Sequence, residues 1–218
     1  EIEMLIRRDP ARRGLIGSDG NGPGQGELAR AAHRFSKISD LTGAALITGF
    51  FIPDTEYNGA KSPRSHATSK PRRGNAETDG PPGTVGLADV LASLGVLTTV
   101  VTDSLCEPVV RAACSTGSAQ NLEILVSPNG HQEAGAWRTS ILERPEIRQI
   151  SHFVAIERVG PGYADATATT SELAAKTGQR VESAALNDWR PGHCSNMRGE
   201  SIDEFSADLH LLIESAKA

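Results

Sequence analysis

Short apolar runs alternate along the chain with segments whose apolar residues recur every three or four positions. The runs are ALITGFFI at residues 44–51, VLTTVVT at 96–102, LEILV at 122–126 and HFVAI at 152–156. Runs of this length and β-branched content are typical of strands covered on both faces. Helical spacing predicts helices over residues 27–39, 85–94, 107–116, 132–143 and 202–216. The alternation predicts an α/β fold, with a mostly parallel sheet flanked by helices on both faces in three layers.

Two of these helices show a definite inward face. The first places Leu28, Ala31, Ala32 and Phe35 inward, and the last places Ile202, Phe205, Leu209, Leu212 and Ile213 inward. Gly95 follows the second helix at the position where glycine commonly ends one.

Two segments interrupt this pattern. Residues 54–76 carry five basic side chains against Asp54 and Glu56, and we expect a flexible basic insertion on the surface. Residues 161–195 have no clear periodicity, and we expect an irregular insertion. The remaining elements form one domain that spans residues 1–218, a length that suits a single core.

Composition narrows the classes of function. The formal net charge of −5 is opposite to that of a typical nucleic-acid-binding protein, and the basic insertion has no interleaved aromatic platform. No apolar run approaches the length of a membrane span. The glycine-rich residues 14–26 match neither dinucleotide-binding nor P-loop spacing, so we expect no nucleotide cofactor. Cys106 and Cys114 are expected to be buried small apolar side chains rather than disulfide partners.

Candidate chemistry lies where the strands end. In open parallel sheets, ligands bind beyond the carboxyl ends of the strands. This rule selects the Thr48-Gly49-Phe50 segment, Asp103 and Glu157. Glu157 is followed by Arg158, so a solvent-exposed ion pair of little energetic value is the alternative interpretation.

The most distinctive motif is ETDGPPGT at residues 77–84. A turn followed by a helix start explains its glycines and prolines. Two carboxylates, Glu77 and Asp79, also project the same way from an extended segment, and such a pair is suited to Mg²⁺ or Mn²⁺ or to acid–base chemistry. Both interpretations stay open on chemistry alone.

Two later motifs are weaker. Asn196-Met197-Arg198-Gly199 supplies an arginine that can clamp a carboxylate, although a lone loop arginine is more often solvated. His193 and Cys194 are adjacent potential metal ligands, but no second pair at zinc spacing accompanies them.

Three blocks in order resemble one family. These are RDPARRGL at residues 8–15, TGF at 48–50 with ETDGPPG at 77–83, and VAIERVG at 154–160 with NMRG at 196–199. They resemble the D-glutamate cyclase C-terminal domain over residues 2 to about 205. The family continues beyond its last helix into two further blocks, so the resemblance leads us to expect a fragment or a shortened homologue, incomplete at the C-terminus.

The resemblance implies an α/β lyase that converts D-glutamate to 5-oxo-D-proline and water, in the mitochondrial matrix or cytoplasm. It implies Glu77, Asp79 and Glu157 as catalytic residues, and Glu77, Asp79, Asp103 and Glu157 as ligands of Mn²⁺ or Mg²⁺. Substrate contacts would come from Gly80, Gly83, Thr84, Asn196 and Arg198. The expected partner is a small molecule similar to D-glutamate, without nucleic acid or membrane, in a monomer or homo-oligomer. A binding or regulatory domain without catalysis, or a metal-dependent hydrolase of another small substrate, is the alternative.

Overall fold

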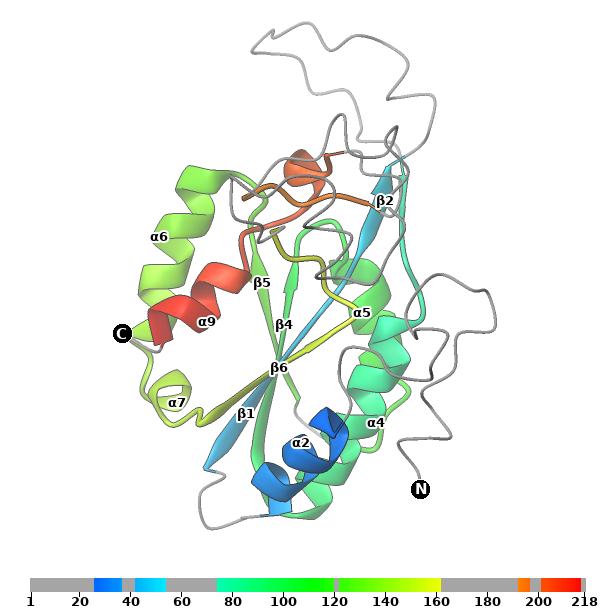
Figure 1. Ribbon diagram of the computed structural model, residues 1–218, viewed down its shortest axis with the longest axis vertical. Coiled ribbons are helices and arrows are strands. Elements are labelled where there is room, and N and C mark those ends of the chain that lie inside the picture. The colour runs from blue at the N-terminus through cyan, green and yellow to red at the C-terminus, as the bar shows by residue number, and fades with distance from the viewer. Residues whose placement is uncertain are drawn as a thin grey trace, which may run out of the picture.

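The chain forms a four-stranded parallel sheet in the order β5-β4-β1-β6 (Figure 1). The computed structural model describes residues 26–36, 42–53, 74–119, 122–161, 192–196 and 201–216. The sheet strands are β1 (Gly43–Thr48), β4 (Leu97–Asp103), β5 (Glu123–Ser127) and β6 (His152–Ile156). The helices are α2 (Glu27–Ser36), α4 (Gly80–Ser93), α5 (Glu107–Cys114), α6 (His131–Leu142), α7 (Pro145–Arg148), the 3₁₀ turn η2 (Asp203–Phe205) and α9 (His210–Ala216). The predicted parallel α/β fold is confirmed.

Strand β1 is the centre of the core, and all six of its residues are buried. Successive side chains of a strand point to opposite faces, so Ala44 and Leu46 enter one apolar cluster while Ala45 and Ile47 enter another. The first cluster also contains buried residues of α4 and α5, and the second contains buried residues of α6, α7 and α9. Burial on both sides explains why the strand is a continuous apolar run.

The predicted strand over residues 44–51 ends earlier than expected, because β1 stops at Thr48 and a second strand begins at Phe51. Gly49 has a φ of 112°, and a Cβ built there would lie 2.7 Å from the Cβ of Cys106. The chain bends at this glycine into β2 (Phe51–Pro53), which pairs antiparallel with β3 (Gly74–Ala76). The expected insertion therefore ends before β3, and residues 54–73 lie outside the described residues.

The predicted helix over residues 202–216 is wrong in one respect, because it is two elements. Ser206, after η2, has extended backbone angles, and α9 begins only at His210. The inward positions Ile202, Phe205, Leu209 and Leu212 are nevertheless buried. The break leaves the carbonyl of Ala207 free to accept a hydrogen bond from Arg158 at 2.6 Å, which an α-helical carbonyl would direct along its own helix.

Helix α2 is confirmed, but its expected inward face is partly wrong, because Ala31 and Ala32 are exposed. Gly95 follows α4 with a φ of 76°, as expected of a residue that ends a helix. The expected irregular insertion is described only at its two ends, where Pro161 and Cys194 form an antiparallel bridge.

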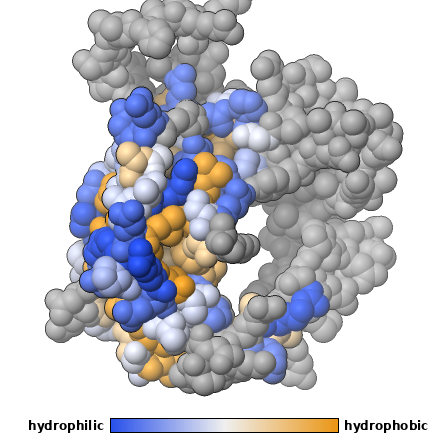
Figure 2. Space-filling model, turned by 90° about the vertical axis from the view of Figure 1, so that its left-hand side faces the viewer, coloured by the Kyte–Doolittle hydropathy of each residue, from blue (hydrophilic) through white to orange (hydrophobic). Residues whose placement is uncertain are grey.

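The side of the molecule that carries α6 and α9 is mixed in character, with apolar residues visible between hydrophilic ones (Figure 2). Trp137 and Ile213 are partly buried against the second apolar cluster. Across the described ranges, no helix combines the length and the apolar character needed to cross a membrane.

Candidate active site at the switch point of the sheet

The strand order reverses direction between β1 and β6. From β1 the chain proceeds to β4 and then β5 on one side, whereas β6 pairs with the opposite side of β1. Connections that leave neighbouring parallel strands in opposite directions open a crevice at the carboxyl ends, and ligands bind there in open α/β sheets. The carboxyl ends at this point are Thr48 of β1 and Ile156 of β6, which are register partners.

Three carboxylates meet at this switch point. Glu77, Asp79 and Glu157 each offer an oxygen atom, and these atoms all lie within 4.8 Å of one another. Glu77 and Asp79 come from the segment between β3 and α4, and Glu157 follows β6 directly. Their convergence across about eighty residues of sequence agrees with the expected acidic site. We refer to these three residues as the acidic cluster.

Each member of the cluster is fixed by a local hydrogen bond or by its backbone conformation. The N–H of Glu77 donates to the carbonyl of Phe50 at 2.7 Å, which ties it to the end of β1. Asp79 is the N-cap of α4, and its carboxylate accepts the N–H of Gly80 at 3.1 Å. Glu157 has a φ of 47°, in the left-handed region that side chains other than glycine seldom adopt. Backbone strain of this kind is often found at functional sites.

Gly80 allows α4 to begin directly against Glu157. A Cβ built on Gly80 would stand 2.6 Å from the Cβ of Glu157 and 2.9 Å from Oγ1 of Thr48. The absence of a side chain at Gly80 is therefore required by Glu157 and Thr48, and the expected substrate contact at Gly80 stays a prediction. A Cβ built on Gly83 would lie 3.6 Å from Ile156, which is an ordinary van der Waals contact. The described protein atoms would therefore leave room for a side chain at Gly83. The hydroxyl of Thr84 is buried and donates to the carbonyl of Gly80 at 3.1 Å.

The cluster is electrostatically unfavourable when nothing neutralises it. Burial, followed by the charges of Asp79 and Glu157, raises the pKa of Glu77 above that of an ordinary glutamate. Like charges and desolvation both favour the protonated form of a carboxyl group. The raised pKa suits Glu77 to exchange a proton.

The donor set fits a hard divalent cation. Mg²⁺ and Mn²⁺ prefer carboxylate, hydroxyl and water oxygens, and all three clustered residues supply carboxylate oxygens. The hydroxyl of Thr48 is fully buried at the same edge and has no hydrogen-bond partner among the described residues. The start of α4 is a poor phosphate cradle, because Asp79 occupies the N–H of Gly80 and the next two residues are prolines, which have no N–H.

Asp103 does not join the cluster. It is fully buried at the end of β4, where Oδ1 accepts the N–H groups of Leu105 and Cys106 at 3.1 and 3.0 Å, and Oδ2 accepts from Arg158. The interpretation of Glu157 and Arg158 as an exposed ion pair is also wrong, because the side chain of Arg158 is only 4% exposed. Sequence reasoning missed Arg158, since an arginine beside a glutamate looks like a solvated pair.

A second polar group connects His193 and Cys194 with Asp203 at the start of η2. The Nδ1 of His193 donates to Oδ2 of Asp203 at 2.5 Å, and Oδ1 of Asp203 accepts the N–H of Cys194 at 2.7 Å. Burial raises the pKa of the Cys194 thiol to about 11. Among the described residues, the group of three possible metal ligands consists of Glu77, Asp79 and Glu157, and it includes neither His193 nor Cys194.

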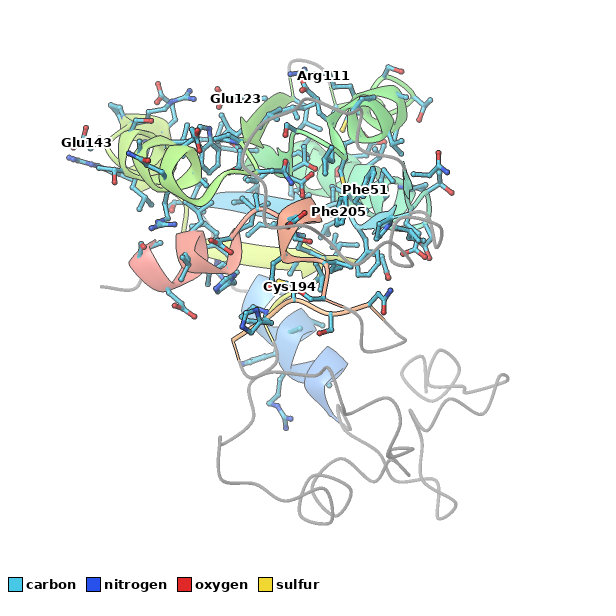
Figure 3. All side chains as sticks on the ribbon, turned by 90° about the horizontal axis from the view of Figure 1, so that it is seen from above. Phe51, Arg111, Glu123, Glu143, Cys194 and Phe205 are labelled. Atoms are coloured by element: carbon cyan, nitrogen blue, oxygen red, sulfur yellow. The ribbon has the colours of Figure 1, made fainter. Side chains whose placement is uncertain are left out.

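The rings of Phe51 and Phe205 stack on each other within the first apolar cluster. Their centroids are 5.6 Å apart and nearly parallel. Seen from above, Cys194 lies near these rings, whereas Glu143 lies well away from them (Figure 3). Of the expected substrate contacts in this region, Asn196 is partly buried, and Arg198 lies outside the described residues.

Comparison with known proteins gives one match. A family model described as D-glutamate cyclase-like, C-terminal, matches residues 2–176. Neither a curated protein nor a solved structure matches the chain. The matched residues include the whole acidic cluster and end before Asn196 and Arg198, short of the expected limit near residue 205.

Proposed function

The chain belongs to the family of D-glutamate cyclase-like C-terminal domains, and on that premise we propose that it converts D-glutamate to 5-oxo-D-proline and water with the help of a divalent cation. The observation that carries the proposal is the convergence of Glu77, Asp79 and Glu157 at the switch point of the sheet. This edge is where an open α/β sheet binds a small ligand.

The chemistry requires both a base and an acid. The α-ammonium group of the substrate must lose a proton before its nitrogen attacks the γ-carboxyl carbon. A C–N bond then forms, the nitrogen loses a second proton, a C–O bond breaks, and the departing oxygen takes up these two protons to leave as water. Ring closure is intramolecular, so orientation of the two reacting groups supplies much of the acceleration.

We assign the proton transfers to Glu77. Its raised pKa brings the carboxyl group closer to neutral pH, where a single group can accept a proton and then deliver it. Asp79 and Glu157 would hold the cation, and Thr48 would offer a hydroxyl from the floor of the site. When bound, the cation would polarise the γ-carboxylate as a Lewis acid. Arg198 is proposed to bind the α-carboxylate through paired hydrogen bonds.

The test is chiral chromatography of D-glutamate incubated with the chain and Mn²⁺ or Mg²⁺. We expect 5-oxo-D-proline in excess of a heat-killed control, and its loss in Glu77→Gln and Asp79→Asn. Glu143→Gln is the matched control, because it makes the same change of charge at an exposed residue after α6 that does not belong to the cluster. Absence of product from the unaltered chain would reject the cyclase activity.

Calorimetry separates the role of the cation from catalysis. Mn²⁺ affinity should fall in Asp79→Asn and Glu157→Gln and stay unchanged in Glu143→Gln. Unchanged affinity in the first two variants would reject the metal role. Binding of Mn²⁺ or D-glutamate without turnover would favour a binding domain, and turnover of other amides, lactams or phosphate esters would favour a different hydrolase.

A further inference from the structure

Arg158 makes an unusual set of contacts for a residue beside an exposed carboxylate. Its Nη1 donates to the carbonyl of Gly49 at 2.9 Å and to Oδ2 of Asp103, and its Nη2 donates to the carbonyl of Ala207 at 2.6 Å. The side chains of Arg158 and Asp103 are 4% and 0% exposed. The guanidinium group is therefore held in the interior by three acceptors from three separate parts of the chain.

These contacts join the ends of three neighbouring strands. Gly49 follows β1, Asp103 ends β4 and Arg158 follows β6, all at the carboxyl edge of the sheet. Asp103 is itself fixed, because its other oxygen accepts two backbone N–H groups at the start of α5. The Asp103–Arg158 pair consequently fixes the position of the chain directly after β6.

Glu157 lies between this anchor and the start of α4. On one side, its Cβ faces Gly80 so closely that a Cβ built on Gly80 would stand 2.6 Å away. On the other side, Glu157 is bonded directly to Arg158. Its φ of 47° is a conformation that a glutamate adopts only when its surroundings impose it.

We propose that the buried Asp103–Arg158 pair is a positioning unit, which holds Glu157 in its left-handed conformation and so turns its carboxylate toward Glu77 and Asp79. The inference rests on the proposed function in so far as the acidic cluster binds a divalent cation. Stability alone does not account for such a pair, because replacing buried ion pairs by apolar residues is often neutral or stabilising. A fixed geometry at a metal ligand does account for it, since groups that orient the ligands strongly influence affinity.

Arginine is required for this role by its shape. The planar guanidinium group directs hydrogen bonds along several fixed directions, whereas the ammonium group of lysine is a compact point charge. Lysine at position 158 would keep the charge beside Asp103 but could not reach Gly49, Asp103 and Ala207 with the same geometry.

The test compares Arg158→Lys and Asp103→Asn with the unaltered 218-residue chain. The matched control is Arg144→Lys, because Arg144 donates to Glu123 at 2.6 Å in a half-buried ion pair away from the cluster. Mn²⁺ affinity is measured by electron paramagnetic resonance. We expect the dissociation constant to rise about 10-fold or more in Arg158→Lys and Asp103→Asn, as for other groups that orient metal ligands, and to stay unchanged in the control.

A second measurement does not depend on the metal. The ¹³Cα and ¹³Cβ chemical shifts of Glu157 report its backbone conformation in the metal-free chain. We expect left-handed values in the unaltered chain and the control, and a move toward extended values in Arg158→Lys. If that variant fails to fold, Asp103→Asn, which preserves side-chain volume, provides the same comparison.

The outcomes distinguish the two proposals. Unchanged Glu157 shifts and unchanged Mn²⁺ affinity in folded variants would overturn the positioning role. If the unaltered chain binds no Mn²⁺, the metal part of the proposed function fails, and the Glu157 shifts alone then decide the positioning role. Altered shifts restricted to the Arg158 and Asp103 variants would support it.

Discussion

Adding one methyl group at Gly80 should have the opposite effect from adding it at Gly86, although both glycines lie in α4. At Gly80 the new Cβ would stand 2.6 Å from the Cβ of Glu157 and 2.9 Å from Oγ1 of Thr48. At Gly86 it would meet nothing within 4 Å. Neither glycine has a φ in the left-handed region, so the difference between the two variants comes from space and not from backbone strain.

The size of the effect follows from these distances. Carbon atoms in contact prefer a separation of about 3.5–4.0 Å, so the start of α4 and the Glu157 backbone would have to move apart by about 1 Å. Neither obstructing atom is the end of a flexible side chain. Overpacking of this kind costs about 1–3 kcal/mol, whereas alanine in place of an exposed glycine inside a helix stabilises by about 0.5–1 kcal/mol.

The assay is urea denaturation followed by circular dichroism. We expect Gly80→Ala to be less stable than Gly86→Ala by about 1.5–4 kcal/mol, the sum of the two effects. Calorimetry should also show weaker Mn²⁺ binding in Gly80→Ala alone, because the displaced Glu157 no longer faces its two partners. Equal stability of the two variants, together with equal Mn²⁺ affinity, would refute the close packing of α4 against Glu157.

Four further predictions concern charge and titration. Two unit charges 4.8 Å apart repel by about 0.9 kcal/mol in water, so Glu157→Gln should stabilise the chain in EDTA by about 1 kcal/mol at low salt; a loss of stability would contradict the mutual repulsion. Burial and two acidic neighbours raise the pKa of Glu77 in the folded chain. Ionisation of Glu77 therefore lowers the free energy of unfolding as pH rises from the ordinary glutamate pKa through the pKa of the folded chain. This decline, followed by urea titrations at several pH values, should be smaller in Glu157→Gln. Burial raises the pKa of the Cys194 thiol to about 11 and also raises the pKa of Cys106, so a thiol reagent at pH 8 should label these cysteines only after unfolding. Burial acts to raise the pKa of Asp203, but hydrogen bonds from His193 and the Cys194 backbone lower it by more. The stability that Asp203 supplies is therefore lost as pH falls through its folded pKa. Asp203→Asn should remove that part of the acid sensitivity.

The chain's local patterns were sufficient to predict most elements of the sheet. Strand β6 occupies the predicted residues 152–156, and the other three parallel strands differ from prediction only at their ends. Their burial on both faces leaves a continuous apolar signal. Local patterns failed where a contact from elsewhere overrides the periodicity. At Ala207 the spacing predicts a helix, but its carbonyl binds Arg158 and the preceding residue, Ser206, has extended backbone angles.

The candidate site was predictable in part. Glu77, Asp79 and Glu157 could be selected because each lies beside a turn or a strand end, where ligands bind in this class of fold. Asp103 has the same position after a strand and was selected for the same reason, yet it is buried in an ion pair. No feature of the sequence distinguishes Asp103 from Glu157, because the distinction depends on which strand is at the switch point.

The amino-acid sequence alone determined the class of fold and the approximate position of each strand, because apolar periodicity and turn residues act over a few neighbouring positions. Only the tertiary structure decided which charges meet. Arg158 reaches Gly49 and Asp103 across 109 and 55 positions, and the strand order β5-β4-β1-β6 brings those positions together. A buried charge such as Asp103 is used in an internal ion pair, whereas an exposed charge such as Glu157 can bind a ligand. Which of the two is buried depends on packing between segments that are remote along the chain.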